Sequence, residues 1–355
     1  MSSGRASRAK LLGSLLLAAA IFAFLFRRVD VAGVRAEIQE MTWLELATVA
    51  LIAGWNQVTY WLLWMAVTPE LGWAQAMTLT QAGTAVTNTV PGGSGIGVGL
   101  AYAMLDSWGF SRARSTLAVL VTGVWNTFIK LVLPVLALAL IALEGDASRS
   151  RVAAGAAAVV LLGLALGGFW LVLRSDRAAA RAGEFAEGAA NRARRLVRRP
   201  PVQGWARATT RFRSRARDLL VRRWPAITGA ALLSHLSLYL VLLVCLRHVG
   251  VGDAEVGWAQ VLFVFAVARL LTAVRFTPGG AGVVEAVLIG GLVAFGGDPA
   301  QVTAAVLVFR ALTWLLPVPV GALTYLGWRW REHRRTAAGA GAVAAVPAEP
   351  GSPSG

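Results

Sequence analysis

The sequence contains very few of the residues that bind metals or form disulfides. Cys245 is the one cysteine among 355 residues, which excludes an intrachain disulfide and a thiolate cluster. The three histidines, His235, His248 and His333, do not complete a closed zinc site without carboxylate ligands. We therefore expect no metal and no cofactor, and we expect plain packing roles for His235 and Cys245, which lie in an apolar run.

Charged residues are scarce as well. They make up 15% of the chain, against about 25% in an ordinary soluble domain, whereas hydrophobic residues reach 57%. The mean hydropathy is +0.62. The length would suit two or three soluble domains, but such domains have no use for this much apolar surface. The composition predicts an all-α fold, a polytopic helical membrane protein.

Long apolar runs are present in the lengths that a bilayer requires. They lie at about 44–67, 115–143, 152–173, 226–249 and 301–328. Residues 11–26 resemble a signal peptide, but no small-residue cleavage site follows, so we interpret them as an uncleaved first span. We expect residues 1–335 to form a single integral membrane domain and the Ala/Gly/Pro/Ser-rich tail at 336–355 to be disordered.

The positive charge is concentrated in one connection between spans. The chain has 34 Lys and Arg against 18 Asp and Glu, and residues 174–223 hold 15 Arg and four acids. The positive-inside rule places this arginine-rich loop, and with it both termini, in the cytoplasm of a multi-pass protein of the cell membrane. The loop fits either a topology determinant without a partner or basic amphipathic helices on the anionic leaflet. A nucleic-acid partner is not expected.

Two further apolar regions, 73–108 and 258–297, are broken in the middle. Each contains a Pro-Gly-Gly turn, Pro91-Gly92-Gly93 in the first and Pro278-Gly279-Gly280 in the second. Proline and paired glycines break a helix, so each region should form two helical pieces around an unwound point. The sequence fits either a re-entrant hairpin or two full spans. Unwound backbone at membrane depth is tolerated only against protein or a water-filled cavity, which makes these breaks candidate functional sites.

The two broken regions belong to an internal repeat. Gly72-Trp73-Ala74-Gln75 recurs as Gly257-Trp258-Ala259-Gln260, and each copy continues with the Pro-Gly-Gly turn and a span carrying a late proline. With the arginine-rich loop inside, the first copy (about 44–143) and the second (about 226–328) have opposite orientations. Inverted repeats with discontinuous helices are typical of transporters, whose site lies at the repeat interface near mid-membrane.

Five ionisable residues fall at membrane depth, where charges are costly and indicate function. They are Lys130, Arg269, Arg275, Glu285 and Arg310. We expect Glu285 to pair with Arg269 or Arg310, leaving an excess of cations that suits an anion such as a phosphate. Two alternatives stay open: a buried ion pair that only fixes helix packing, and proton or cation coupling through Glu285.

The segment TPGGAGVVEAVL at 277–288, with Arg269 before it and Arg310 after it, resembles the membrane region of lysylphosphatidylglycerol synthase/flippase proteins. NTVPGGSGIG at 88–97 is also similar to that family, and the resemblance covers most of residues 11–330. It implies a stand-alone member without the soluble aminoacyltransferase domain, which moves lipids between leaflets. The residues that match the family's broken-helix motif are Pro278, Gly279, Gly280, Gly282 and Glu285.

The sequence thus predicts a flippase-type translocator for an anionic phospholipid or a polyprenyl-phosphate-linked lipid, with membrane lipids as partners. Arg269, Arg275, Arg310 and Lys130 would bind the anionic headgroup, and Glu285 would orient an arginine or a cationic headgroup. The turns at 91–93 and 278–282 would act as hinges. The alternatives are a secondary transporter of a small water-soluble anion and, with less support, an integral membrane lipid-modifying enzyme, for which no cluster of acids is present. We expect no catalytic residues, and the sequence leaves a homo-oligomer open.

Overall fold

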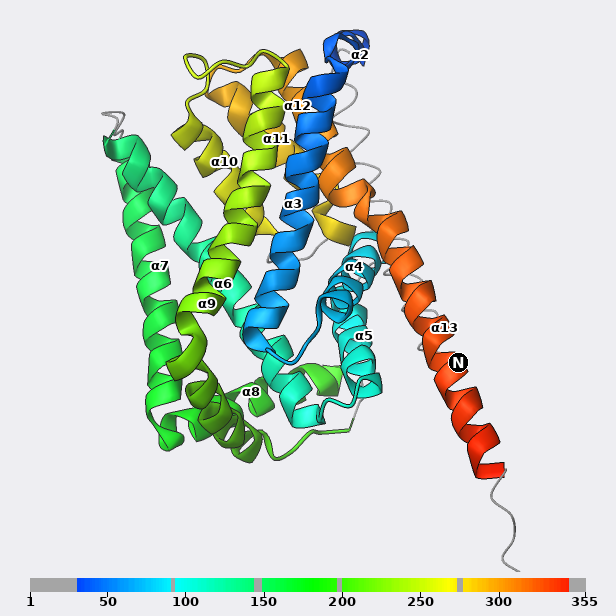
Figure 1. The fold of residues 1–355 in the computed structure, drawn as a ribbon. Coiled ribbons are helices and arrows are strands. Elements are labelled where there is room, and N and C mark those ends of the chain that lie inside the picture. The colour runs from blue at the N-terminus through cyan, green and yellow to red at the C-terminus, as the bar shows by residue number, and fades with distance from the viewer. Residues whose placement is uncertain (1–30, 91–92, 144–148, 197–199, 273–276, 345–355) are drawn as a thin grey trace, which may run out of the picture.

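The computed structural model describes residues 31–90, 93–143, 149–196, 200–272 and 277–344, and every regular element in these ranges is a helix (Figure 1). The expected all-α fold is therefore confirmed. The predicted first span at 11–26 lies outside the described residues. Within them, four helical segments are long and apolar enough to cross a membrane, or up to five if one bent pair counts as a single span.

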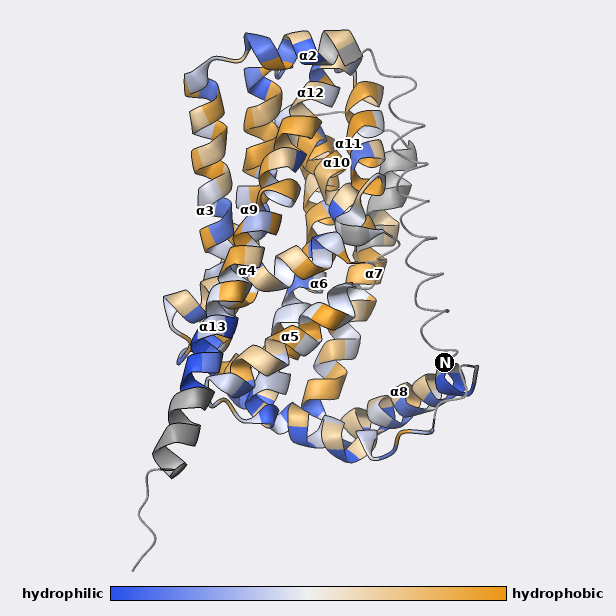
Figure 2. Cartoon of the chain, turned by 90° about the vertical axis from the view of Figure 1, so that its right-hand side faces the viewer, coloured by the Kyte–Doolittle hydropathy of each residue, from blue (hydrophilic) through white to orange (hydrophobic). Residues whose placement is uncertain are grey.

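Upright helices form the body of the molecule and agree with the predicted spans. After the short α2 (Val31–Glu40) they are α3 (Trp43–Val67), α6 (Arg112–Leu143), α7 (Arg149–Arg174) and α9 (Trp205–His248). Thr42 and Glu45 form a capping box at the start of α3, with the Thr42 backbone N–H donating to Glu45 Oε2 at 2.8 Å. Orange, apolar residues predominate over much of the upright part of the molecule in Figure 2, whereas α2 is largely blue.

Both broken regions are hairpins. The first is α4 (Trp73–Thr89) followed by α5 (Gly93–Ser107), and the second is α10 (Trp258–Leu271), a short turn η1 (Pro278–Gly280) and α11 (Val283–Ala294). With 14 and 12 residues, α10 and α11 reach only about 21 and 18 Å, less than the roughly 30 Å apolar core of a bilayer. The hairpins occupy opposite ends of the molecule in Figure 1, α4 and α5 below and α10 and α11 above. The short helices of the second hairpin favour the re-entrant alternative for that region.

The repeated Gly-Trp-Ala-Gln motif performs the same task in both hairpins. Gln75 Oε1 accepts a hydrogen bond from the Gly72 backbone N–H at 2.9 Å, and Gln260 Oε1 accepts one from Gly257 at 3.0 Å. Each glutamine thereby satisfies a backbone donor that the first helical turn leaves without a partner. The motif starts the first helix of each hairpin at its tryptophan.

The connection at 174–223 is mostly helical, the form that the amphipathic-helix interpretation of this arginine-rich loop expected. Helix α8 (Asp176–Leu196) follows α7 after a bend of 117°, and α9 begins at Trp205, well before the predicted span at 226–249. Arg213 Nε donates to Asp176 Oδ1 at 2.9 Å and holds α9 against the bend. Figure 2 shows α8 lying across the lower end of the upright helices.

The predicted span at 301–328 is interrupted as well. It consists of α12 (Pro299–Arg310), a π-helical turn η2 (Ala311–Leu315) and α13 (Pro317–Ala344). Pro317 lacks a backbone N–H, so it opens α13 and breaks the regular ladder before it. Because α13 continues through Ala344, residues 336–344 of the predicted disordered tail are helical, and residues 345–355 lie outside the described part.

The helices of the two halves pack reciprocally. The last helix of the second half, α13, contacts α4 of the first, and α6 of the first half contacts α10 of the second. Gly321 makes the first contact close, because any β-carbon there would clash with the Gln81 carbonyl on α4. Buried Leu133, Leu242 and Phe265 belong to the core cluster that joins α6, α9 and α10. This packing brings the two hairpin tips together.

Candidate functional site

A cavity of about 390 Å³ lies where the two hairpins meet. Residues of both hairpins and of α3, α6, α9 and α12 line it. Two of them are the arginines Arg269 and Arg310, and many others carry amide or hydroxyl groups: Asn56, Gln57, Thr80, Thr84, Thr87, Asn88, Ser94, Thr122, Asn126 and Thr313. The volume falls within the range of about 300–1,000 Å³ usual for small-molecule sites.

The hairpin tips touch through Asn88 and Gly279. Asn88 Nδ2, in the last turn of α4, donates to the carbonyl of Trp314 in η2 at 2.9 Å. Gly279 has φ +57°, and a β-carbon there would clash with the Trp314 ring and lie 2.8 Å from Asn88 Oδ1. Only glycine combines this left-handed backbone with so close an approach. The break in the second hairpin is thus fixed by contacts from both halves.

Glu285 and Arg310 form a buried ion pair beside the cavity. Arg310 Nε donates to Glu285 Oε1 at 2.6 Å, and their side chains are 11% and 4% exposed. Glu285 Oε2 accepts the backbone N–H of Gly282 at 2.7 Å and caps α11. Of the two partners expected for Glu285, the structure shows Arg310. Since both carboxylate oxygens are engaged and Glu285 is not a lining residue, its position suits orientation of the arginine.

Three groups contact the guanidinium of Arg310, and one of its nitrogens is left without a hydrogen bond to a described residue. Besides Glu285, its Nη2 donates to the Gly279 carbonyl at 3.4 Å, and its Cζ lies 5.1 Å from the centre of the Trp314 ring. Within the described part of the chain, Nη1 makes no hydrogen bond. Because Arg310 also lines the cavity, its Nη1 is a donor that remains available for a ligand.

Arg269 has no counter-charge among the residues that the structure describes. Its Nε atom is buried, and its guanidinium makes no hydrogen bond or ion pair with any residue that the structure describes. A buried cation without a partner is costly, and an anion in the cavity would supply the missing hydrogen bonds. With Arg310 neutralised by Glu285, Arg269 leaves the cavity with a net positive charge.

The other predicted site residues are placed less directly. Lys130 is not a lining residue: its Nζ donates to Thr272 Oγ1 at 3.1 Å, at the end of α10. Gly280 and Gly282 have φ values of +73° and +81°, as the predicted unwound point requires, while Pro278 lies at the start of η1. Gly93 opens α5, where a β-carbon would clash with the backbone of α4. Arg275, Pro91 and Gly92 lie outside the described residues.

Sequence reasoning missed the uncharged part of the site. Asn88 and Trp314 connect the hairpin tips, and Gln81 Nε2 donates to Gln57 Oε1 at 3.2 Å behind the cavity. An asparagine or glutamine inside an apolar span is unusual enough to have indicated these positions. Among the described residues, no three His, Cys, Asp or Glu side chains gather where they could hold a metal ion.

The comparisons with known proteins place the chain in a family. No curated protein matches it. Residues 11–321, most of the chain, match the lysylphosphatidylglycerol synthase TM region. The match covers both hairpins and the cavity between them, and it supports a membrane-lipid-related function for a multi-pass membrane protein. The chain therefore belongs to the family of the lysylphosphatidylglycerol synthase TM region, as its Pro-Gly-Gly motifs predicted.

Proposed function

We propose that this protein is a flippase-type translocator, which moves an anionic phospholipid or a polyprenyl-phosphate-linked lipid between leaflets. The observation that carries the proposal is Arg269, whose buried Nε has no partner among the described residues and which lines a polar cavity where the two hairpins meet. A lipid phosphate would occupy the cavity and accept hydrogen bonds from Arg269 and from the open side of Arg310.

We infer that the two halves are inverted repeats. The hairpins at opposite ends, the matching glutamine caps and the reciprocal packing of α4 with α13 and α10 with α6 support this inference. In transporters of this design the substrate site lies between the repeats, and the repeats move against each other. We place the α8 end in the cytoplasm of a cell-membrane protein, with both termini on that side, because of its arginines.

The roles of the charged residues follow from their contacts. Arg269 and Arg310 bind the phosphate, and Glu285 positions Arg310 from behind the cavity wall. Lys130, at the end of α10, adds positive charge near the site. The glycines of η1 and Gly282 let the hairpin tip change conformation when the site opens to the other leaflet. The proposal includes no catalytic step, so purified protein should leave its lipid chemically unchanged.

A lipid-flipping measurement in proteoliposomes tests this function. Phosphatidylglycerol labelled with a fluorophore is distributed over both leaflets, and a membrane-impermeant reductant reports how fast the inner pool reaches the outside. We expect fast exchange with the wild-type protein and at least tenfold slower exchange with Arg269→Gln or Arg310→Gln. Arg217→Gln, an exposed arginine of α9, is the matched control and should behave as wild type. Equal rates in all four proteins would contradict the proposal.

The dense lining of amides and hydroxyls favours a second candidate, a transporter of a small water-soluble anion. Such a solute needs polar partners on all sides, whereas a lipid needs a lateral path for its chains. The same proteoliposomes distinguish the two. Uptake of a labelled soluble anion without lipid exchange would support the second candidate, and lipid exchange without uptake supports the first.

A further inference from the structure

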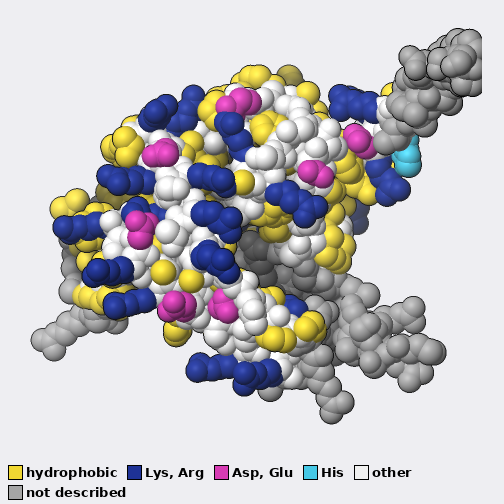
Figure 3. All heavy atoms as spheres, turned by 90° about the horizontal axis from the view of Figure 1, so that it is seen from below, with side chains coloured by type: hydrophobic (Ala, Val, Ile, Leu, Met, Phe, Trp, Pro, Cys, Tyr) yellow, Lys and Arg dark blue, Asp and Glu magenta, His cyan; other side chains and the backbone are white. Residues whose placement is uncertain are grey.

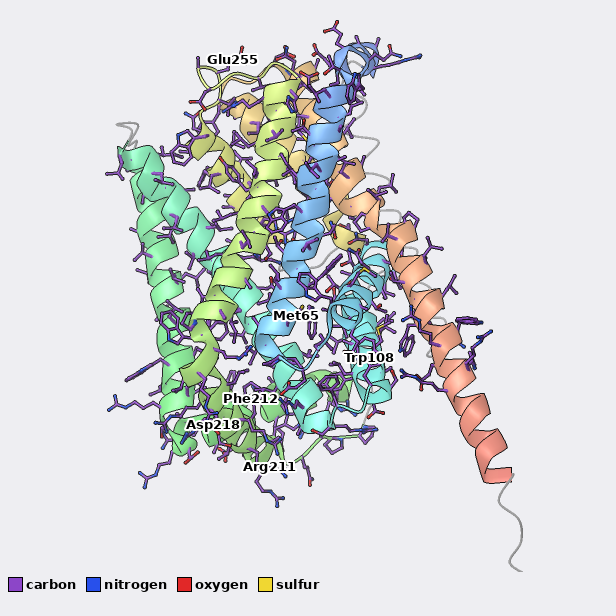
Figure 4. The ribbon with its side chains drawn as sticks, viewed as in Figure 1. Met65, Trp108, Arg211, Phe212, Asp218 and Glu255 are labelled. Atoms are coloured by element: carbon purple, nitrogen blue, oxygen red, sulfur yellow. The ribbon has the colours of Figure 1, made fainter. Side chains whose placement is uncertain are left out.

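A second cavity, of about 580 Å³, lies at the lower end of the molecule and shares no lining residue with the central one. The end of α3, the start of α6 and the first half of α9 form it. Four arginines line it, with one acid, two hydroxyls and an apolar wall. Figure 4 labels that acid, Asp218, at the foot of α9, and Figure 3 shows Lys and Arg side chains spread over the face seen from below.

The level of this basic cavity along the membrane normal can be inferred from the positions where its three helices end, begin or turn from basic to apolar. Helix α3 ends at Val67, α6 begins at Arg112, and α9 passes from an arginine-rich segment to its apolar span at Trp224. Trp224 itself is 56% exposed, as expected for a tryptophan at a membrane interface. Three candidate spans therefore end or begin around this cavity, and in a bilayer these ends would lie at the level of the lipid headgroups.

Two of its four arginines have no protein partner. Arg114 pairs with Glu70, and Arg223 Nη1 donates to the Ala66 carbonyl at 3.3 Å. Arg215 and Arg222 line the cavity without a hydrogen bond or an ion pair to any residue within the described ranges. The side chains of Thr68 and Ser111 add hydroxyl donors to the same cavity.

We propose that this basic cavity binds the phosphate of an anionic phospholipid from the leaflet next to α8, at a site separate from the central cavity. Arg215 and Arg222 bind the phosphate oxygens, and Val67, Leu117 and Leu219 contact the first carbons of the acyl chains. Basic cavities between spans at this depth are suited to lipid headgroups. This site goes beyond the proposed translocation and does not depend on it.

A binding measurement tests the site. The full-length protein in detergent is titrated with short-chain phosphatidylglycerol, and bound lipid is counted by native mass spectrometry. We expect Arg215→Gln/Arg222→Gln to bind one lipid about 30-fold more weakly, since each arginine near an anionic headgroup contributes roughly a fivefold factor. The matched control is Arg207→Gln/Arg217→Gln, which removes the same charge from exposed positions of α9 outside this cavity. Equal weakening in both double variants would show attraction by overall charge and would overturn the proposal.

Two further arms identify the ligand. Inorganic phosphate is added as a competitor, and we expect it to displace the lipid only at far higher concentrations, because it lacks acyl chains. Competition at equal concentrations would overturn the assignment to a lipid. Arg269→Gln is titrated in parallel and should retain this binding step, which separates the basic cavity from the central one. If Arg269→Gln abolishes the step and Arg215→Gln/Arg222→Gln leaves it unchanged, the bound lipid occupies the central cavity and the proposal fails.

Discussion

Glu285 Oε1 lies 2.6 Å from Arg310 Nε, in a buried pair that joins α11 to α12 beside the central cavity. The carboxylate also caps the helix that follows the broken turn, through the backbone of Gly282. One acid thus connects the unwound point of the second hairpin to an arginine that lines the cavity. Glu285 therefore stabilises the fold, whereas Arg269 and Arg310 line the cavity where a ligand would bind.

Glu285→Gln should destabilise the protein, because it leaves the buried Arg310 without its counter-charge. We expect a loss of about 3–5 kcal/mol in unfolding free energy, measured by thermal or denaturant unfolding in detergent. Glu285→Met/Arg310→Met removes both charges and should recover most of this stability while lipid flipping remains slow. Recovery of flipping in the double variant would show that Arg310 is needed only for packing.

Arg269→Gln should slow lipid flipping without lowering the stability of the protein. No hydrogen bond or ion pair to the described residues is lost, so the unfolding free energy should stay equal or rise. A charged hydrogen bond to a phosphate contributes about 1.5–3 kcal/mol, so lipid flipping should fall roughly 10- to 100-fold. Arg269→Lys keeps the charge and should recover part of the rate. A variant that is strongly destabilised would contradict the absence of a partner.

Gly279→Ala should disturb the hairpin tip, since the left-handed backbone costs about 1–2 kcal/mol with a β-carbon and the methyl group would clash with Trp314. Thermal unfolding in detergent measures the loss. Gly290→Ala in α11 is the control, because nothing lies within 4 Å of its added methyl group, and it should be neutral or slightly stabilising. Trp314→Ala combined with Gly279→Ala should relieve the clash but not the backbone strain. Equal effects at both glycines would contradict the tight contact.

The orientation can be tested by labelling single cysteines with a membrane-impermeant maleimide. Cys245 is buried and is replaced by alanine to give a background without cysteine. Glu255 and Arg211 are exposed at opposite ends of the molecule (Figure 4). We expect Glu255→Cys to react in intact cells and Arg211→Cys to react only after the membrane is permeabilised, because the arginine-rich end faces the cytoplasm. The reverse pattern would invert the proposed topology.

The sequence predicted the features that depend on local chemistry. Apolar runs locate α3, α6 and α7 to within a few residues, and the Pro-Gly-Gly turn locates the break between α10 and α11. The prediction was less accurate for a polar segment that is helical. Helix α9 begins at Trp205, about 20 residues before the predicted span at 226–249, because arginine is a good helix former even outside an apolar run. The arginines and the glutamate at membrane depth were also identifiable, because their cost in a bilayer does not depend on which neighbours they have.

Only the tertiary structure decided which of these residues meet. Arg269 and Arg310 were equal candidates for Glu285, and the packing of α11 against α12 selects Arg310, 25 positions along the chain. Asn88 and Trp314, which connect the hairpin tips, lie 226 positions apart. Hydropathy and helix breakers act over a few residues and are readable in the sequence, whereas these contacts depend on how whole helices pack against each other. The sequence therefore determined a membrane protein with two broken hairpins and cations in apolar segments, and the packing alone put Arg269 beside a cavity with no partner among the described residues.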